Sequence, residues 1–242
     1  MSSDRRTFLQ RLTLGSVAFG ALPASLRAEQ PAPAASAPEE FNEFAGLDEQ
    51  SAAQPAAQTF DVSWTQKLTG KHRAVFDVPA IVGGAGVMRA ALWVNHYKSV
   101  LKAATSDISP VIVIRHAGIA LLMSNAFWEE YDIGKKEKVR HPVTDKKLAR
   151  NPVLLTVEDD QISAGSANNA LHKQIERGVV VLGCDMAFAQ IVRIVAKQDK
   201  LPNPEARAKA VTMIVPGVIM QPNGIFGVTL AQQNGCVYVQ AT

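Results

Sequence analysis

The chain has 242 residues, of which 25 are basic and 22 are acidic, giving a formal net charge of +3. Four arginines and one aspartate lie within residues 1–28, so the rest of the chain carries equal numbers of basic and acidic residues. Because the basic excess is confined to this leader, composition argues against a nucleic-acid-binding domain, and we expect no nucleic-acid partner.

The leader is basic at its start and then apolar. Arg5 and Arg6 stand just before a Phe-Leu pair, and an apolar run follows at 12–24. This run is shorter than the roughly 20 residues that a membrane-spanning helix needs, and small residues after it suit cleavage near Ala28 or Ala24. The paired arginines indicate a twin-arginine signal, with a basic amphipathic helix as the alternative. We therefore expect the twin-arginine export machinery as a partner, a periplasmic mature protein and no stable membrane span after processing.

Residues 29–59 are rich in Ala, Pro and Glu and contain no Lys or Arg. Proline at this density interrupts helices and central strands, and few large apolar side chains are available for burial. We predict a disordered linker here. The predicted organisation is a signal peptide at 1–28, a linker at 29–59 and one folded domain at 60–242.

The folded region alternates between predicted strands and helices. Short apolar, β-branched runs predict strands at 72–81, 108–118, 179–183, 211–220 and 236–241. Helical spacing predicts helices at 87–104, 119–131, 166–178 (with Ser166 as N-cap), 185–200 and 223–235. Consecutive β-branched residues imply strands buried on both faces, and helical crossovers imply parallel pairing. The predicted fold class is α/β: a five-stranded, mostly parallel sheet with helices on both faces.

The periodic pattern breaks at 132–167. Within this insert, the stretch KKEKVRHPVTDKKLAR contains seven Lys or Arg residues and two acidic ones. Such a charged stretch is typical of a solvated surface, and it also suits the docking of an acidic protein partner.

Ligands of open parallel sheets bind beyond the carboxyl ends of the strands. The predicted strand ends carry Gly-containing segments at 83–86, 115–118, 183–185 and 216–224. The residues from these segments that we select as site candidates are Cys184 and His116 for chemistry, and Gly84, Gly86, Arg115, Pro216 and Gly217 for binding.

The glycine loop is an incomplete dinucleotide fingerprint. Gly84 and Gly86 supply G-x-G, but Arg89 occupies the place of the last glycine, and no acidic residue follows at the end of the next strand. A tight turn whose helix-terminal amides face a small anion is the alternative. His116 either acts at the site, as a proton shuttle or by orienting a bound group, or is a hydrogen-bonded, half-buried side chain at a strand end. Arg115 has the same ambiguity between a functional and a structural role.

Other chemistries find little support in the sequence. The histidines are scattered without metal-ligand spacing, so no metal is predicted, and no Gly-x-Ser-x-Gly elbow of an α/β-hydrolase is present. The sequence does not identify a cofactor.

Cys184 follows a predicted strand and precedes a predicted helix, where backbone N–H groups favour a thiolate. The negative charge of Asp185 disfavours the thiolate of Cys184 unless the Asp185 side chain caps the helix. Cys236 opens the last predicted strand, so in a parallel sheet the two thiols lie at opposite edges and an internal disulfide is not expected. Cys184 is therefore either a reactive thiol or a small core residue, whereas Cys236 is more typical of core packing.

Two regions, 72–127 and 168–242, resemble the DsrE/DsrF-like family of sulfur-relay and related proteins. The matching positions are Gly178-Val179, Cys184, Pro216-Gly217-Val218, Leu230, Gln232, Gly235 and Tyr238. The resemblance implies a flavodoxin-like sandwich with five parallel strands, assembly into homo-oligomers, and a cysteine at position 184 that accepts sulfane sulfur as a persulfide. The leader and the basic insert depart from the family pattern.

Three functions follow as hypotheses. The first is an exported protein that handles sulfur or thiol groups through Cys184, with His116 and the loop at 83–86 lining the pocket for a small sulfur-containing ligand. The second is a non-catalytic binding or assembly module of the same fold, with Cys184 in the core. The third is a cofactor-bearing protein, because twin-arginine export typically carries proteins that fold before translocation.

Overall fold

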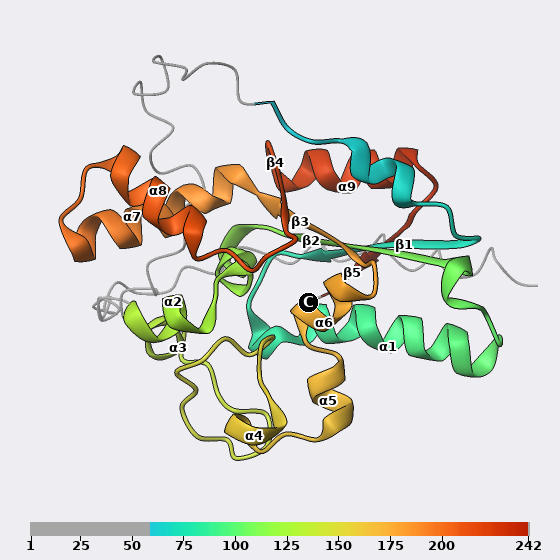
Figure 1. Ribbon diagram of the computed structural model, residues 1–242, viewed down its shortest axis with the longest axis horizontal. Helices are drawn as coiled ribbons and strands as arrows, with labels where there is room; N and C mark the ends of the chain where they lie inside the picture. Colours follow the sequence, from blue (N-terminus) through green and yellow to red (C-terminus); the bar gives the residue numbers. More distant parts are fainter. Residues whose placement is uncertain (1–58, 242) are drawn as a thin grey trace, which may run out of the picture. The chain divides into compact units, whose positions relative to one another are not determined.

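The computed structural model describes residues 59–241, so the predicted signal peptide and all but one residue of the predicted linker lie outside the described residues. The described chain contains a five-stranded sheet in the order β4-β3-β2-β1-β5, with every neighbouring pair parallel (Figure 1). The strands are β1 (His72–Val78), β2 (Ile108–Ile114), β3 (Val180–Cys184), β4 (Ile219–Gln221) and β5 (Val237–Gln240). This arrangement confirms the predicted α/β fold class.

Each face of the sheet has its own apolar core. Phe76 and Ile112 point into the larger core, which α1 (Ala85–Val100) and α7 (Asp185–Asp199) help to form. The neighbouring residues Val75 and Val111 point the other way, into a smaller core that α9 (Gly224–Gln233) and the 3-10 helix η2 (Ser63–Lys67) cover. Figure 1 shows α9 above the sheet and α1 below it. Burial on both faces explains why the strands have apolar residues at consecutive positions.

The strand order accounts for which helix lies on which face. From β1 to β4 the chain moves across the sheet in one direction, and the connection through α9 then returns to place β5 beside β1. Right-handed crossovers put connections that run in opposite directions on opposite faces. α1 and α7 therefore share one face, and α9 lies on the other.

The shorter helices complete the chain between these elements. They are the α-helices α2 (Asn125–Glu130), α3 (Ile133–Lys136), α4 (Val157–Asp160), α5 (Ala164–Asn168), α6 (Leu171–Glu176) and α8 (Asn203–Thr212), and the 3-10 helices η3 (Val82–Gly84), η4 (Thr105–Asp107) and η5 (His116–Leu122). No helix within residues 59–241 is long and apolar enough to cross a membrane.

Two predicted helices are divided in the structure. The helix predicted at 119–131 is η5 followed by α2, whose N-cap Ser124 accepts a hydrogen bond from the backbone N–H of Phe127. The helix predicted at 166–178 is α5 followed by α6, and the N-cap of α5 is Ser163 instead of Ser166. The Ser124 hydroxyl satisfies an N–H of the first turn of α2, which starts a new helix where the periodic pattern alone predicts continuity. Helix α6 begins after Ala170 without a side-chain cap.

The strand predicted at 211–220 is wrong over most of its length. Helix α8 extends to Thr212, and β4 contains only Ile219–Gln221. Met213 and Ile214 are partly buried against the larger core, so their apolar character reflects packing between elements and not a strand. A short apolar run does not distinguish these two possibilities.

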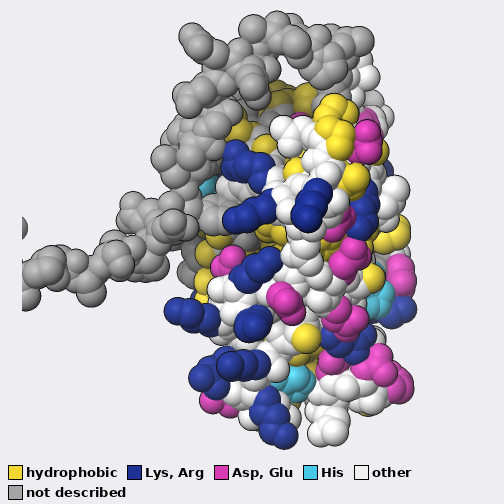
Figure 2. Space-filling model, turned by 90° about the vertical axis from the view of Figure 1, so that its left-hand side faces the viewer, with side chains coloured by type: hydrophobic (Ala, Val, Ile, Leu, Met, Phe, Trp, Pro, Cys, Tyr) yellow, Lys and Arg dark blue, Asp and Glu magenta, His cyan; other side chains and the backbone are white. Residues whose placement is uncertain are grey.

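The basic insert at 132–167 has an apolar interior and a charged exterior. Val139, Leu148 and Ile162 are buried in the larger core. The insert is also held by Arg150, which forms ion pairs with Asp159 and with the buried Asp160. Its exposed basic side chains are Lys135, Lys136, Lys138, Arg140, Lys146 and Lys147, and Figure 2 shows Lys and Arg side chains gathered on this side of the molecule.

Candidate functional site

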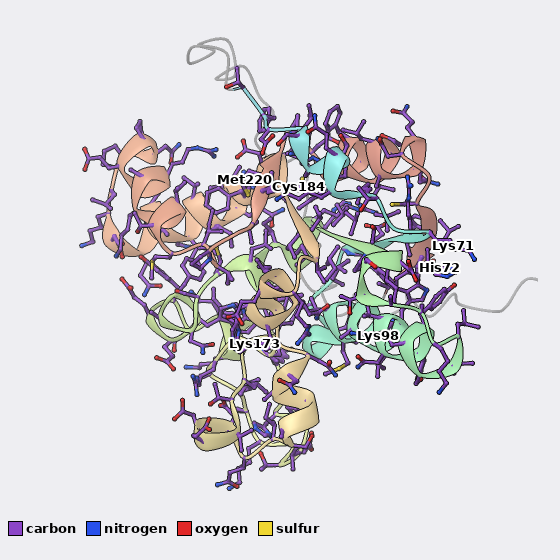
Figure 3. All side chains as sticks on the ribbon, turned by 45° about the vertical axis from the view of Figure 1, so that its right-hand side comes forward. Lys71, His72, Lys98, Lys173, Cys184 and Met220 are labelled. Carbon is purple, nitrogen blue, oxygen red and sulfur yellow. The ribbon has the colours of Figure 1, made fainter. Side chains whose placement is uncertain are left out.

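Cys184 is the last residue of β3 and also the N-cap of α7. Its side chain is buried, with the residue only 1% exposed, and Sγ accepts a hydrogen bond from the backbone N–H of Ala187 at 3.3 Å. Met220 of the neighbouring strand β4 lies close by (Figure 3). The sulfur is therefore enclosed in the core at the positive end of a 15-residue helix, where a negative charge is stabilised.

Asp185 neither caps α7 nor competes with the sulfur for its amides. Its Oδ1 lies 2.5 Å from Nη2 of Arg207 on α8, and the Arg207 guanidinium also stands 5.5 Å from the centre of the Phe188 ring. The acidic side chain that follows Cys184 is thus neutralised from a neighbouring helix.

Cys236 lies just before β5, at the amino edge of the sheet, whereas Cys184 ends β3 at the carboxyl edge. Cys236 is a free, buried thiol. Burial raises its pKa to about 11, because the apolar surroundings disfavour the thiolate. The second cysteine is therefore poorly suited to nucleophilic chemistry.

Arg115 belongs to a polar cluster around the buried carboxylate of Asp77, on the α9 face of the sheet. Its Nε and Nη2 donate hydrogen bonds to the two carboxylate oxygens of Asp77 at 2.7 and 2.9 Å. The hydroxyl of Tyr238 on β5 donates to the same carboxylate at 2.9 Å. Gly224, at the start of α9, packs so closely that an added Cβ would lie 2.4 Å from Cδ of Arg115. These contacts fix Arg115 as a link between β1, β5 and α9.

His116 follows Arg115 at the carboxyl edge of the sheet. It is half-buried and has a positive φ of 48°, which few residues other than glycine adopt readily. Backbone bonds hold the turn to the end of β1, since Arg115 N–H donates to the carbonyl of Val78 and Gly118 N–H to that of Pro79. The backbone here is fixed in a conformation that the side chain does not favour by itself.

Pro216 and Gly217 lie at the opposite edge from the one that we predicted. They precede β4, so they stand at its amino end. Gly217 has a φ of 89°, and an added Cβ would lie 2.5 Å from Cγ2 of Ile175 on α6. Their place as carboxyl-edge candidates is wrong because β4 begins only at Ile219; the segment beyond its carboxyl end begins at Pro222.

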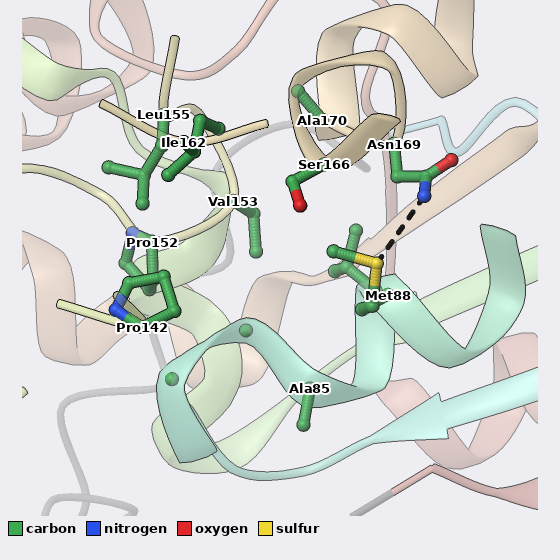
Figure 4. A pocket seen from close by; sticks show the side chains of 13 residues that line it. Ala85, Met88, Pro142, Pro152, Val153, Leu155, Ile162, Ser166, Asn169 and Ala170 are labelled. Carbon is green, nitrogen blue, oxygen red and sulfur yellow. Dashed lines mark hydrogen bonds between the residues drawn. The ribbon is translucent and has the colours of Figure 1, made fainter. Parts of the chain in front are cut away.

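The glycine loop after β1 forms one wall of a cavity of about 210 Å³. Gly83 and Gly84 of η3 and Ala85 at the start of α1 line it on one side, and Val153, Leu155 and Ile162 line it from the insert (Figure 4). Asn169 stands at one side, where its Nδ2 lies 3.5 Å from Sδ of Met88. The cavity is mostly apolar and joins two segments that are about 70 residues apart in the chain.

Glycine is required at position 84 on two grounds. Its φ is 83°, and an added Cβ would lie 2.7 Å from Cγ1 of Val153. Gly86 has a different role: it packs against Val78 of β1 and does not line the cavity.

The structure groups only some of the predicted site residues. Cys184 ends β3, and Gly84, Arg115 and His116 lie beyond the carboxyl ends of β1 and β2. Neither Cys184 nor His116, however, lines the cavity beside Gly84. Within residues 59–241 no group of three His, Cys, Asp or Glu side chains is placed to hold a metal ion.

Asp77 and Asn169 are not among the residues selected from the sequence, and Tyr238 is named there only for the family resemblance. An acidic residue inside the apolar run AVFDV was the available signal for Asp77, because a buried carboxylate needs a partner. Tyr238 and Asn169 gave no such signal, since both types are ordinary in strands and helix ends.

The chain matches no family model, no curated protein and no solved structure.

Proposed function

We propose that the domain is a non-catalytic binding module whose ligand occupies the cavity between the glycine loop and the insert. The observation that carries this proposal is the cavity itself, which combines a glycine loop at the carboxyl edge of the sheet with apolar side chains of the insert. This edge is where ligands of open parallel sheets bind. The burial of Cys184 supports a binding role over thiol chemistry.

The ligand is a small and mostly apolar molecule. The cavity has a volume of about 210 Å³ and is lined mostly by apolar side chains. Apolar cavities of about this size bind compact hydrocarbon-like groups. Ser166 and Asn169 at the margin provide hydrogen-bonding groups that orient a ligand with one polar end.

The test uses phenol, a compact apolar probe with one polar end, titrated into the isotopically labelled full chain. We expect amide signals of Gly84, Val153 and Ile162 to shift together. Ser166 of α5 points into the cavity (Figure 4), so Ser166→Phe should fill it and weaken binding at least about tenfold. Ala104→Phe, at an exposed site outside the cavity, should leave it unchanged. Shifts that survive Ser166→Phe would contradict the proposal.

A second candidate function is a persulfide carrier related to the DsrE/DsrF-like proteins. It is favoured by the hydrogen bond from the Ala187 N–H to Sγ of Cys184 at the start of α7, which would stabilise an anionic sulfur. With thiosulfate as donor, the thiolate forms a bond to the outer sulfur, the S–S bond of thiosulfate breaks, and sulfite leaves.

Persulfide labelling after treatment with thiosulfate distinguishes this candidate. Cys184→Ser should abolish the label, and Cys236→Ser, which removes the other buried thiol, should leave it intact. Equal labelling of wild type and Cys184→Ser would rule out the carrier role.

A further inference from the structure

A cationic hollow lies between the insert and the C-terminal half of α7. Its volume is about 460 Å³, and it is lined by Lys136 of α3 and by Ile194, Lys197 and Gln198 of α7. Within residues 59–241 neither lysine forms an ion pair. Figure 2 views this side of the molecule and shows several Lys and Arg side chains over it. The hollow thus offers two exposed ammonium groups beside a partly buried apolar side chain.

Acidic side chains of the adjoining elements are already bound elsewhere. Asp199 of α7 and Glu130 of α2 both bind the ammonium of Lys209 on α8, at 2.7 and 2.6 Å. Asp199 also accepts a hydrogen bond from the hydroxyl of Tyr131 at 2.8 Å. The neighbouring part of the insert adds positive charge, because residues 135–147 contain six basic and two acidic side chains. This surface therefore favours an anionic occupant.

The chain itself contains a segment of the opposite charge. Residues 41–58, which lie outside the described residues, contain Glu43, Asp48 and Glu49 and no Lys or Arg. Phe44 stands next to Glu43, so the segment combines an apolar side chain with carboxylates. The hollow combines an apolar side chain with ammonium groups, so the two are complementary in charge and in apolar character.

The segment is tethered close enough to reach the hollow. The carbonyl oxygen of Asp61 accepts a hydrogen bond from Nε2 of Gln221 at 2.8 Å, and Gln221 pairs with Cys184, the N-cap of α7. At a rise of about 1.5 Å per residue, Lys197 lies about 20 Å further along this helix. The chain between Glu49 and Asp61 spans up to about 40 Å when it is extended. Contact within one molecule is therefore possible.

We propose that the acidic segment 41–49 docks on this hollow of its own chain. Its carboxylates bind Lys136 and Lys197, and Phe44 packs against Ile194. Tethering gives the segment a high effective concentration, so that weak, exposed ion pairs suffice to hold it. A separate acidic protein of the same chemistry lacks this advantage. The contact is independent of the ligand proposed for the apolar cavity beside the glycine loop.

The test attaches a nitroxide to the isotopically labelled full chain through Ala45→Cys. Because Cys184 and Cys236 are buried, the reagent reacts at position 45. We expect paramagnetic broadening of the amide signals of Ile194 and Gln198 in about 0.01 M salt, and its loss in about 1 M salt, where the Debye length is about 3 Å. No broadening of these signals, or broadening that persists in high salt, would overturn the proposal.

Charge variants of the nitroxide-labelled chain test the two lysines. The double change Lys136→Gln and Lys197→Gln should lower the equilibrium constant for docking at least about threefold, which reduces the broadening. Lys71→Gln and Lys102→Gln, made together, remove two exposed charges outside the hollow and should leave the broadening unchanged. Full broadening in the variant of Lys136 and Lys197 would refute the assignment.

A mixture of two chains tests whether the segment docks within one molecule. An isotopically labelled wild-type chain is mixed with an unlabelled chain that carries the nitroxide. We expect no broadening of Ile194 or Gln198, because each hollow binds the segment of its own chain. Broadening in this mixture would show that a second copy supplies the segment, and it would overturn docking within one chain.

Discussion

The ion pair between Asp77 and Arg115 shows how much a single residue depends on a strand that lies far from it in sequence. The Asp77 carboxylate is 4% exposed, and it receives hydrogen bonds from Arg115 and from Tyr238 on β5. Arg115 was predictable as a strand-end residue. Its partner was not, because the pairing depends on the register of β1 against β2, which a single sequence does not contain.

Replacing Arg115 with Met should destabilise the fold by about 3–5 kcal/mol, because it leaves a buried carboxylate without a counterion. Urea denaturation measures the loss. Arg140→Met is the matched control: Arg140 and Asp145 are both exposed, so breaking their pair should cost less than about 1 kcal/mol. Equal losses in the two variants would mean that the Asp77 pair does not act as a buried ion pair.

At the scale of elements, the central strands and α7 were predictable, and α8 was not. β1, β2 and β3 have apolar residues at consecutive positions and are buried on both faces. This pattern does not depend on where in the sheet a buried parallel strand lies. The segment 211–220 is equally apolar, yet it spans a helix end, a turn and a short strand. Its apolar residues pack against other elements, and that information is absent from local sequence. For the same reason the prediction placed Pro216 and Gly217 at the carboxyl edge of the sheet, although they lie at its amino edge.

The packing of α1 on the sheet gives a prediction at this scale. An added Cβ at Gly86 would lie 2.7 Å from Cγ1 of Val78 and 2.9 Å from the carbonyl oxygen of Ala241. Gly86→Ala should therefore destabilise the domain by about 1–3 kcal/mol. Thermal or urea unfolding measures this effect.

Gly165 is the matched control for Gly86. It lies within α5, and an added Cβ would have Ser163 Oγ at 3.9 Å as its nearest neighbour. Gly165→Ala should stabilise the protein by up to about 1 kcal/mol, because alanine has the higher helix propensity. If both substitutions have the same sign, close helix–strand contact does not explain the requirement for Gly86.

At the scale of the whole molecule, the insert forms a cavity together with the glycine loop at the carboxyl edge of the sheet. In the sequence it is a break in periodicity with excess basic charge. In the structure it contributes Val153, Leu155 and Ile162 to a cavity wall opposite the glycine loop. The loop was predictable as a site candidate, because glycines follow a strand. The opposing wall was not, because no local pattern connects residues 83–85 with 153–162.

Export is the prediction that concerns the whole chain, and it rests on the leader sequence. We propose that Arg5 and Arg6 direct the protein to the twin-arginine pathway. Changing both to Lys keeps the positive charge and should leave the full-length protein in the cytoplasm, whereas wild type should reach the periplasm cleaved after Ala24 or Ala28.

Arg11→Lys and Arg27→Lys, made together in the same leader, form the control that should still be exported. Cell fractionation with mass determination of the mature N-terminus measures both outcomes. Full export of the Arg5 and Arg6 variant would show that the arginine pair is not the signal, and that the basic, apolar leader acts in another way.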